Sequence, residues 1–170
     1  MDNVLLRRSI RKYDLTKKVS FDIMHKLCEA AEAAPSAKNQ KSREYIIVDD
    51  KNIIDKLAEV AKGTMILNEC NTVIVVLGKN PNDIPRPDMQ PQDLAAATEN
   101  ILIAATSLKI GSCWCGIYPM EDRIEKVKNI LNINDLRFPF SLVALGYPLD
   151  NNEFRDKQKF SEDILHYNRG

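Results

Sequence analysis

Apolar residues recur at the spacing of an α-helix in four stretches of the chain. These stretches cover residues 20–34, 51–61, 91–109 and 120–131. The first begins at Ser20, whose side chain can cap a helix, and it ends before Pro35, which cannot continue one. The third is apolar on every side between Ile101 and Ala105. That pattern predicts a helix buried against its own sheet and also against a second surface.

Four short runs of β-branched and other apolar residues predict strands between these helices. They lie at residues 44–50, 72–78, 112–117 and 140–147. The first is expected to be a buried strand. The run at 72–78 is continuously apolar, which predicts a central strand covered on both faces. Helices alternate with strands, so we predict an α+β fold, an α/β sandwich with a sheet of four or five strands flanked by helices.

The length of 170 residues suits one domain, which we place over residues 1–170. A polar loop at 79–91 precedes the longest helix, and a polar tail of some 20 residues closes the chain. The tail has little apolar content of its own, so it is stable only if it packs on another surface. A partner subunit is a natural candidate for that surface.

Composition excludes several classes of partner. Hydrophobic residues make up 44% of the chain and charged residues 28%, and the formal net charge is zero. A neutral protein as a whole is not drawn to nucleic acid or to an anionic membrane. No run approaches the roughly 18 apolar residues of a membrane span, and the N-terminus does not have the pattern of a signal peptide. We therefore expect a cytoplasmic protein that binds neither nucleic acid nor membrane.

The four cysteines lack the paired spacing of a zinc site, and we expect reduced thiols and no bound metal. They are Cys28, Cys70, Cys113 and Cys115. Cys113 and Cys115 belong to one predicted strand, and we expect their side chains on opposite faces of it. Buried cysteines more often act as small hydrophobic residues than as redox groups.

A cluster of cations interrupts this neutral chain near its N-terminus. Arg7, Arg8, Arg11 and Lys12 lie within six positions, together with Ser9. Guanidinium groups match phosphate oxygens two at a time, and a serine hydroxyl adds a donor without bulk. On charge alone the cluster is equally compatible with a solvated basic face or a nucleic-acid contact, although zero net charge argues against the latter.

Several segments, taken in order, resemble the nitroreductase family of flavoproteins. Arg7, Ser9 and Arg11 are similar to its RxSxR/K signature. Residues 35–40 resemble the P-S-x-x-N-x-Q loop, residues 109–117 resemble the GLGSCWIG stretch, and residues 145–148 and 164–168 are also family-like. The collinear set spans nearly the whole chain. It implies a nitroreductase-like fold with a mixed sheet and an intertwined homodimer that holds flavin mononucleotide (FMN) at the subunit interface.

The resemblance also implies roles for the basic cluster. Arg7 and Ser9 would hold the phosphate and ribityl chain of tightly bound FMN, and Arg8 would add to them. Arg11 would lie near the N1/O2 edge of the flavin, where its positive charge favours acceptance of hydride.

Three further groups would complete the site. A loop that would reach the FMN of the other subunit contains Pro35, Ser36 and Asn39. The backbone that would lie beside the isoalloxazine, with one N–H directed at flavin N5, belongs to Cys115, Gly116 and Ile117. A basic pair in the tail would close on the phosphate, namely Lys157 and Lys159. Without the family context these positions are equally typical of turn residues, a strand-end glycine and solvated lysines.

The chain departs from the family pattern at two places. Lys41, Ser42 and Arg43 stand where many relatives have Pro-Trp, and Lys109 stands where glycine is usual. Three residues are candidates for the contact with the pyrimidine edge of the flavin, namely Lys62, Asn68 and Asn71.

The resemblance implies an oxidoreductase with a ping-pong cycle. NADH or NADPH would deliver hydride to flavin N5, and a small acceptor such as a nitroaromatic or a quinone would then take it. No side chain need act as an acid or base, so no catalytic side chain is assigned. Two alternatives stay open, a family member with different flavin chemistry and a flavin-binding electron carrier or sensor without rapid turnover.

Overall fold

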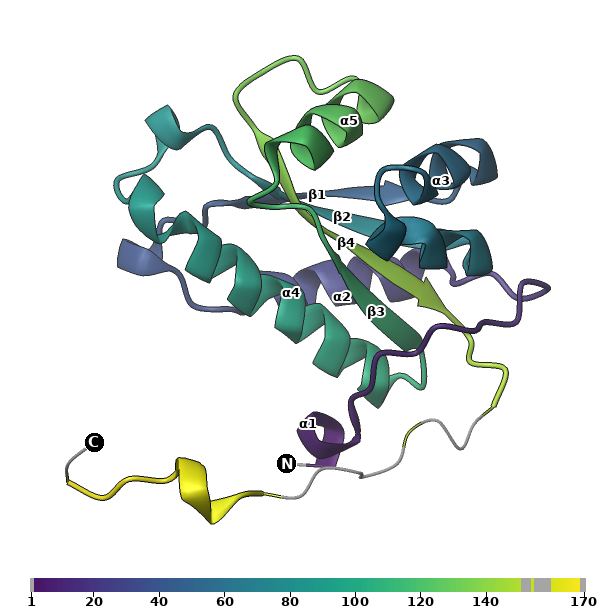
Figure 1. The fold of residues 1–170 in the computed structure, drawn as a ribbon, viewed down its shortest axis with the longest axis horizontal. Helices are drawn as coiled ribbons and strands as arrows, with labels where there is room; N and C mark the ends of the chain where they lie inside the picture. The colour runs from purple at the N-terminus through teal and green to yellow at the C-terminus, as the bar shows by residue number, and fades with distance from the viewer. Residues whose placement is uncertain (1, 151–153, 155–159, 169–170) are drawn as a thin grey trace.

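A four-stranded sheet forms the centre of the computed structural model, which describes residues 2–150, 154 and 160–168 (Figure 1). The strands are β1 (Arg43–Val48), β2 (Thr72–Gly78), β3 (Gly111–Gly116) and β4 (Phe138–Gly146). Their order is β1-β2-β4-β3, and each neighbouring pair is antiparallel. The sheet is therefore antiparallel and not the mixed sheet expected from the sequence, and the one parallel contact within the described ranges is an isolated bridge between Ser9 and Ser112.

Helices cover both faces of the sheet. The α-helices are α1 (Asp2–Leu6), α2 (Phe21–Glu32), α3 (Lys51–Ala58), α4 (Gln90–Ser107) and α5 (Glu121–Leu131). Short 3-10 helices are η1 (Ala37–Asn39), η2 (Lys62–Glu69), η3 (Pro81–Asp83), η4 (Pro87–Met89) and η6 (Glu162–Ile164). Side chains of α2 and α4 pack in one apolar cluster, and those of α3, η2 and α5 pack in the other. In Figure 1, α2 and α4 lie on one side of the sheet and α3 and α5 on the other. The sheet therefore lies between two helical layers, as the sequence predicts.

The second strand, β2, joins the two clusters. All seven of its residues are buried. Val73, Val75 and Leu77 belong to one cluster, whereas Ile74 and Val76 belong to the other. Burial of each such side chain contributes roughly 1.5–3 kcal/mol. The predicted central strand covered on both faces is confirmed.

Two expectations are corrected in detail. β1 is an edge strand whose four middle residues are only half-buried, so the expected buried strand is buried only at its two ends. The helix predicted at 51–61 ends at Ala58 and is followed by η2. The cap at Ser20 is confirmed, since its side chain accepts a hydrogen bond from the N–H of Ile23 at 3.4 Å.

The segment after α1 packs against the sheet at two glycines. A Cβ added to Gly111 would lie 2.9 Å from Cγ2 of Ile10, and one added to Gly146 would lie 2.8 Å from the ring of Tyr13. Ile10 and Tyr13 are themselves buried. Any larger side chain at either glycine would push this segment away from β3 and β4.

The end of α4 explains why glycine would suit position 109. Lys109 has φ 59°, in the left-handed region that disfavours residues with a Cβ. Its N–H donates to the carbonyl of Thr106 at 3.1 Å, and the N–H of Ile110 donates to the carbonyl of Ala105 at 2.9 Å. These two bonds form a Schellman motif, so the chain keeps the turn despite the lysine.

We predict that Lys109→Gly raises the free energy of unfolding by about 1 kcal/mol, because it relieves the left-handed lysine without removing either hydrogen bond. Urea unfolding of wild type and of Lys109→Gly, at the same protein concentration, measures the difference in free energy of unfolding. Lys56→Gly, at an exposed position inside α3, is the control and should lower stability by about 1 kcal/mol. A loss of stability in Lys109→Gly would contradict this account of the turn.

Candidate functional site

The N-terminal segment runs along the free edge of β3. The N–H of Ile10 donates to the carbonyl of Ser112 at 3.0 Å, beside the parallel bridge from Ser9 to Ser112. The N–H and C=O of one strand residue point to the same side and alternate along the strand. The backbone groups of Ser112, Trp114 and Gly116 therefore point away from β4. This places the Gly116 N–H on the outer edge of the sheet, as its predicted role requires.

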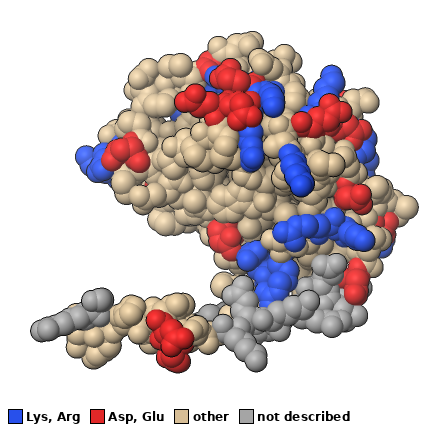
Figure 2. All heavy atoms as spheres, viewed as in Figure 1, with Lys and Arg blue, Asp and Glu red and all other residues tan. Residues whose placement is uncertain are grey.

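The predicted phosphate cations gather at this edge but differ in their contacts. Nε of Arg7 lies 3.0 Å from Oε1 of Glu99 on α4. Nη1 of Arg8 donates to two backbone carbonyls, at 2.8 and 2.7 Å, so this guanidinium is turned back onto its own segment. Nη1 of Arg11 donates to the carbonyl of Ser9 at 3.1 Å. Figure 2 shows Lys and Arg side chains gathered on the part of this face where the N-terminal segment runs.

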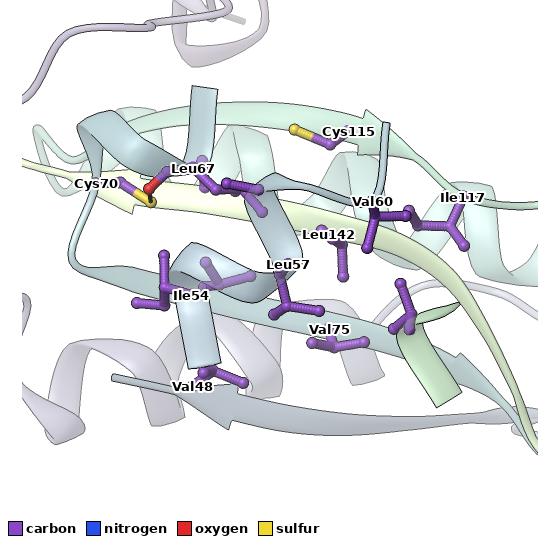
Figure 3. Close-up of a cluster of buried hydrophobic side chains, with 14 of the residues drawn as sticks. Val48, Ile54, Leu57, Val60, Leu67, Cys70, Val75, Cys115, Ile117 and Leu142 are labelled. Atoms are coloured by element: carbon purple, nitrogen blue, oxygen red, sulfur yellow. Dashed lines mark hydrogen bonds between the residues drawn. The ribbon is translucent and has the colours of Figure 1, made fainter. Parts of the chain in front are cut away.

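Two cysteine side chains share one face of β3, so the expectation of opposite faces is wrong. Residues two apart on a strand point to the same side. Cys113 and Cys115 both lie in the cluster that contains Cys70, and Figure 3 shows Cys70 and Cys115 among its apolar side chains. The Cys115 thiol, followed by the Arg11 cation and the Ser9 hydroxyl, holds the pKa of Cys113 below its ordinary value, while burial opposes that shift. The thiols of β3 therefore lie close to the positive charge of the basic segment, which is residues 7–12.

The outer edge of β3 has room for a flat group. A Cβ added to Gly116 would meet nothing within 4 Å. Its carbonyl accepts a hydrogen bond from Nη1 of Arg123 at 3.1 Å, which leaves the N–H as the outward donor. Oγ of Ser112 is buried and has no hydrogen-bond partner within the part of the chain that the structure describes. The outward backbone donors, the cations and the open surface at Gly116 fit FMN, which combines a phosphate with a flat ring.

The loop at 35–42 is held by one carboxylate of α4. Oδ1 of Asp93 accepts from the N–H of Ala37 at 2.9 Å, and Oδ2 accepts from Nε2 of Gln40 at 2.7 Å and from Oγ of Ser42 at 2.8 Å. Asp93 is 5% exposed. The loop needs this anchor because three of its residues have positive φ, namely Lys38, Asn39 and Lys41.

Within one chain, the loop and the basic segment lie apart. The loop is held near the first turn of α4, whereas Arg7 contacts Glu99, six residues further along this helix, or about 9 Å along its axis. In Figure 1, η1 lies beside the N-terminal end of α4 and α1 beside its C-terminal end. The structure thus brings Arg7, Ser9 and Arg11 to β3 but does not bring Pro35, Ser36 and Asn39 to them.

Three other groups of predicted residues lie outside the described part of the chain or make other contacts. Lys157 and Lys159 lie outside the described residues. Nδ2 of Asn71 donates to the backbone carbonyls of residues 15 and 17, so this amide ties two loops together. Ile117 is buried in the cluster of α3 and α5, and its N–H donates to the carbonyl of Phe140 on β4 at 3.2 Å, so neither its side chain nor its N–H faces the outer edge of β3.

Sequence reasoning missed the two carboxylates that hold the predicted ligand groups. Asp93 looks like an ordinary acidic residue in the first turn of a helix, and nothing nearby in sequence indicates its partners. Glu99 carried a signal, because it is the one acidic residue of α4 beyond the first turn of the helix. Such a carboxylate calls for a cationic partner.

The chain matches the model of the nitroreductase family over residues 4–69 and 65–147. A protein of Archaeoglobus fulgidus, provisionally named NADH dehydrogenase/NAD(P)H nitroreductase, is 38% identical over 165 residues, covering 96% of this chain and 94% of that protein. The crystal structure of a provisionally named NADH oxidase from Clostridium acetobutylicum has a TM-score of 0.92 at 36% identity, over 99% of this chain and 100% of that one.

An FMN-dependent nitroreductase from Clostridium difficile has a TM-score of 0.89 over 99% of both chains, and at 23% identity it shows the shared fold alone. Together with the Clostridium acetobutylicum structure, it confirms the nitroreductase-like fold expected from the sequence.

We predict that Asp93→Ala lowers the free energy of unfolding by about 3 kcal/mol, because buried donors of the loop lose a charged acceptor. Denaturant unfolding measures the loss. Asp22→Ala, in the first turn of α2 at an exposed position, is the matched control and should change stability by less than about 1 kcal/mol. Equal effects of the two substitutions would show that Asp93 does not anchor the loop.

Proposed function

Because the chain belongs to the nitroreductase family, we propose that it is an oxidoreductase that uses FMN to pass hydride from NADH or NADPH to a small acceptor, such as a nitroaromatic or a quinone. When bound, FMN supplies the hydride chemistry at its N5 atom. The observation that carries the proposal is the alignment of the basic segment with the outer edge of β3. This alignment places cations and an outward backbone N–H on one edge.

The basic segment would bind and orient the cofactor. Arg7 and Ser9 would hold the phosphate and ribityl chain, with Arg8 and the tail residues Lys157 and Lys159 adding positive charge. Arg11 would hold its cation near the N1/O2 edge of the ring, where it lowers the cost of added negative charge. These cations lie in a chain of zero net charge, so they are a local anion site.

The end of β3 would position the ring. The Gly116 N–H would donate toward flavin N5, with the backbone of Cys115 and Ile117 on either side. An aromatic group stiffens this strand end, since Tyr118 stacks on Phe140 with ring centroids 5.8 Å apart. The proposal gives no side chain the role of acid or base.

We propose that the site is built by two copies of the chain. One observation that supports this is that the loop of Pro35, Ser36 and Asn39 is held near the first turn of α4 and does not meet Arg7 within one chain. Apolar side chains exposed on η6 and around it support it as well, namely Phe160, Ile164, Leu165 and Tyr167. Figure 1 shows the segment of η6 extended away from the sheet, and apolar groups in that position favour burial on a partner.

An absorption spectrum of the purified protein tests the cofactor and its reduction. We expect bands at about 370 and 450 nm that bleach under anaerobic NADH or NADPH. Bound flavin that neither nicotinamide bleaches would favour an electron carrier or a member with other flavin chemistry. A colourless protein that fails to take up added FMN would refute the proposal.

The two-subunit site predicts a particle of twice the chain mass of 19.3 kDa in sedimentation equilibrium. Changing both Ile164 and Leu165 to Ser should weaken this dimer, because two exposed apolar side chains would lose a partner surface. Replacement of Leu136 by Ser, an exposed apolar residue between α5 and β4, is the control and should leave the mass unchanged. A wild-type monomer that binds FMN would rule out the shared site.

A further inference from the structure

We propose that Glu99 is a positioning residue, which holds the Arg7 guanidinium in the orientation that a phosphate monoester requires. The inference rests on the proposed function, because it takes Arg7 as the anchor of the FMN phosphate. It adds a residue of α4 that no sequence motif indicates. Its basis is the ion pair between Nε of Arg7 and Oε1 of Glu99, at 3.0 Å.

The ion pair leaves the outer part of the guanidinium available. The carboxylate approaches Nε, the nitrogen nearest to the backbone. Among the described residues, no hydrogen bond from Nη1 or Nη2 of Arg7 is found. Phosphate oxygens are bound best by two parallel N–H groups of one guanidinium. The side chain of Arg7 is 24% exposed, so these groups can be reached from solvent.

Glu99 also counters repulsion within the basic segment. Arg7, Arg8 and Arg11 lie within five positions, and their like charges repel when no phosphate is present. A carboxylate beside Arg7 offsets part of this repulsion in the ligand-free protein. The guanidinium is thereby kept near the edge of β3 before the cofactor arrives, which reduces the entropy lost on binding.

The setting of Glu99 differs from that of an ordinary surface pair. Its side chain is 42% exposed, and partial burial raises the pKa of Glu99 while Arg7 lowers it. Arg7 is the one described charge that acts on this carboxylate. The pair Arg86 and Asp88, by contrast, is exposed and joins two residues of one turn. Glu99 thus joins α4 to the basic segment from a partly buried position.

A rival role for Glu99 predicts the opposite change in FMN affinity when the carboxylate is removed. If Glu99 merely competed with phosphate for Arg7, its removal would strengthen FMN binding. If it positions Arg7, Glu99→Ala weakens FMN binding, whereas Glu99→Gln keeps an oxygen at the same place without its charge and restores most of the affinity. Riboflavin lacks the phosphate, so its affinity should not respond to either change.

The experiment titrates flavin-free protein with FMN and with riboflavin, following the loss of flavin fluorescence. We expect Glu99→Ala to raise the Kd for FMN about tenfold and to leave the Kd for riboflavin within about twofold, whereas Glu99→Gln stays within about threefold of wild type for both. The matched control is Glu44→Ala on β1, which removes a 2.8 Å pair with Arg137 of similar exposure at the opposite edge of the sheet. It should leave both affinities unchanged.

Any one of the following results would overturn the inference. If Glu99→Ala binds FMN as tightly as wild type, the carboxylate has no role in FMN binding. If it binds FMN more tightly, the carboxylate competes with the phosphate for Arg7. Equal weakening for FMN and riboflavin, or failure of Glu99→Gln to restore affinity, would reduce it to a structural contact. If wild type binds neither flavin, the proposed function fails and the inference fails with it. Flavin binding by wild type with no effect at Glu99 refutes this inference alone.

Discussion

The contact on which the site depends is the packing of Ile10 and Tyr13 over Gly111 and Gly146. Two missing side chains let the segment after α1 approach the sheet closely enough for the N–H of Ile10 to bond to β3. Once Ile10 is buried, its polar neighbours on either side must face outward along that edge. Apolar packing thus holds the cluster of cations beside β3. No electrostatic attraction is needed to place it there.

The helix α4 imposes a second constraint, because it holds both groups of predicted ligands. Asp93 anchors the strained loop near the first turn, and Glu99 contacts Arg7 further along. A stiff helix keeps these two groups at a set separation within one chain. The proposal of a flavin site shared by two subunits agrees with that separation. It also gives the apolar side chains exposed around η6 a surface on which to pack.

Much of the fold and part of the site could be predicted from local patterns. The cap at Ser20, the central strand β2 and the positions of α4 and β3 followed from spacing over a few residues. The grouping of Arg7, Ser9 and Arg11 was equally local, and the structure places these residues at one edge of the sheet. The shared face of Cys113 and Cys115 was also within reach of sequence, since strand geometry requires it, and our expectation there was mistaken.

The sequence by itself determined the elements and the family, because helical and strand periodicity depend on residues only a few positions apart. Tertiary structure alone decided the strand order, the partner of each carboxylate and the separation of the loop from the basic segment. Glu99 lies 92 positions from Arg7, and Asp93 meets Ser42 across 51 positions. Contacts of this kind arise when the sheet brings distant segments together, and no local pattern records them.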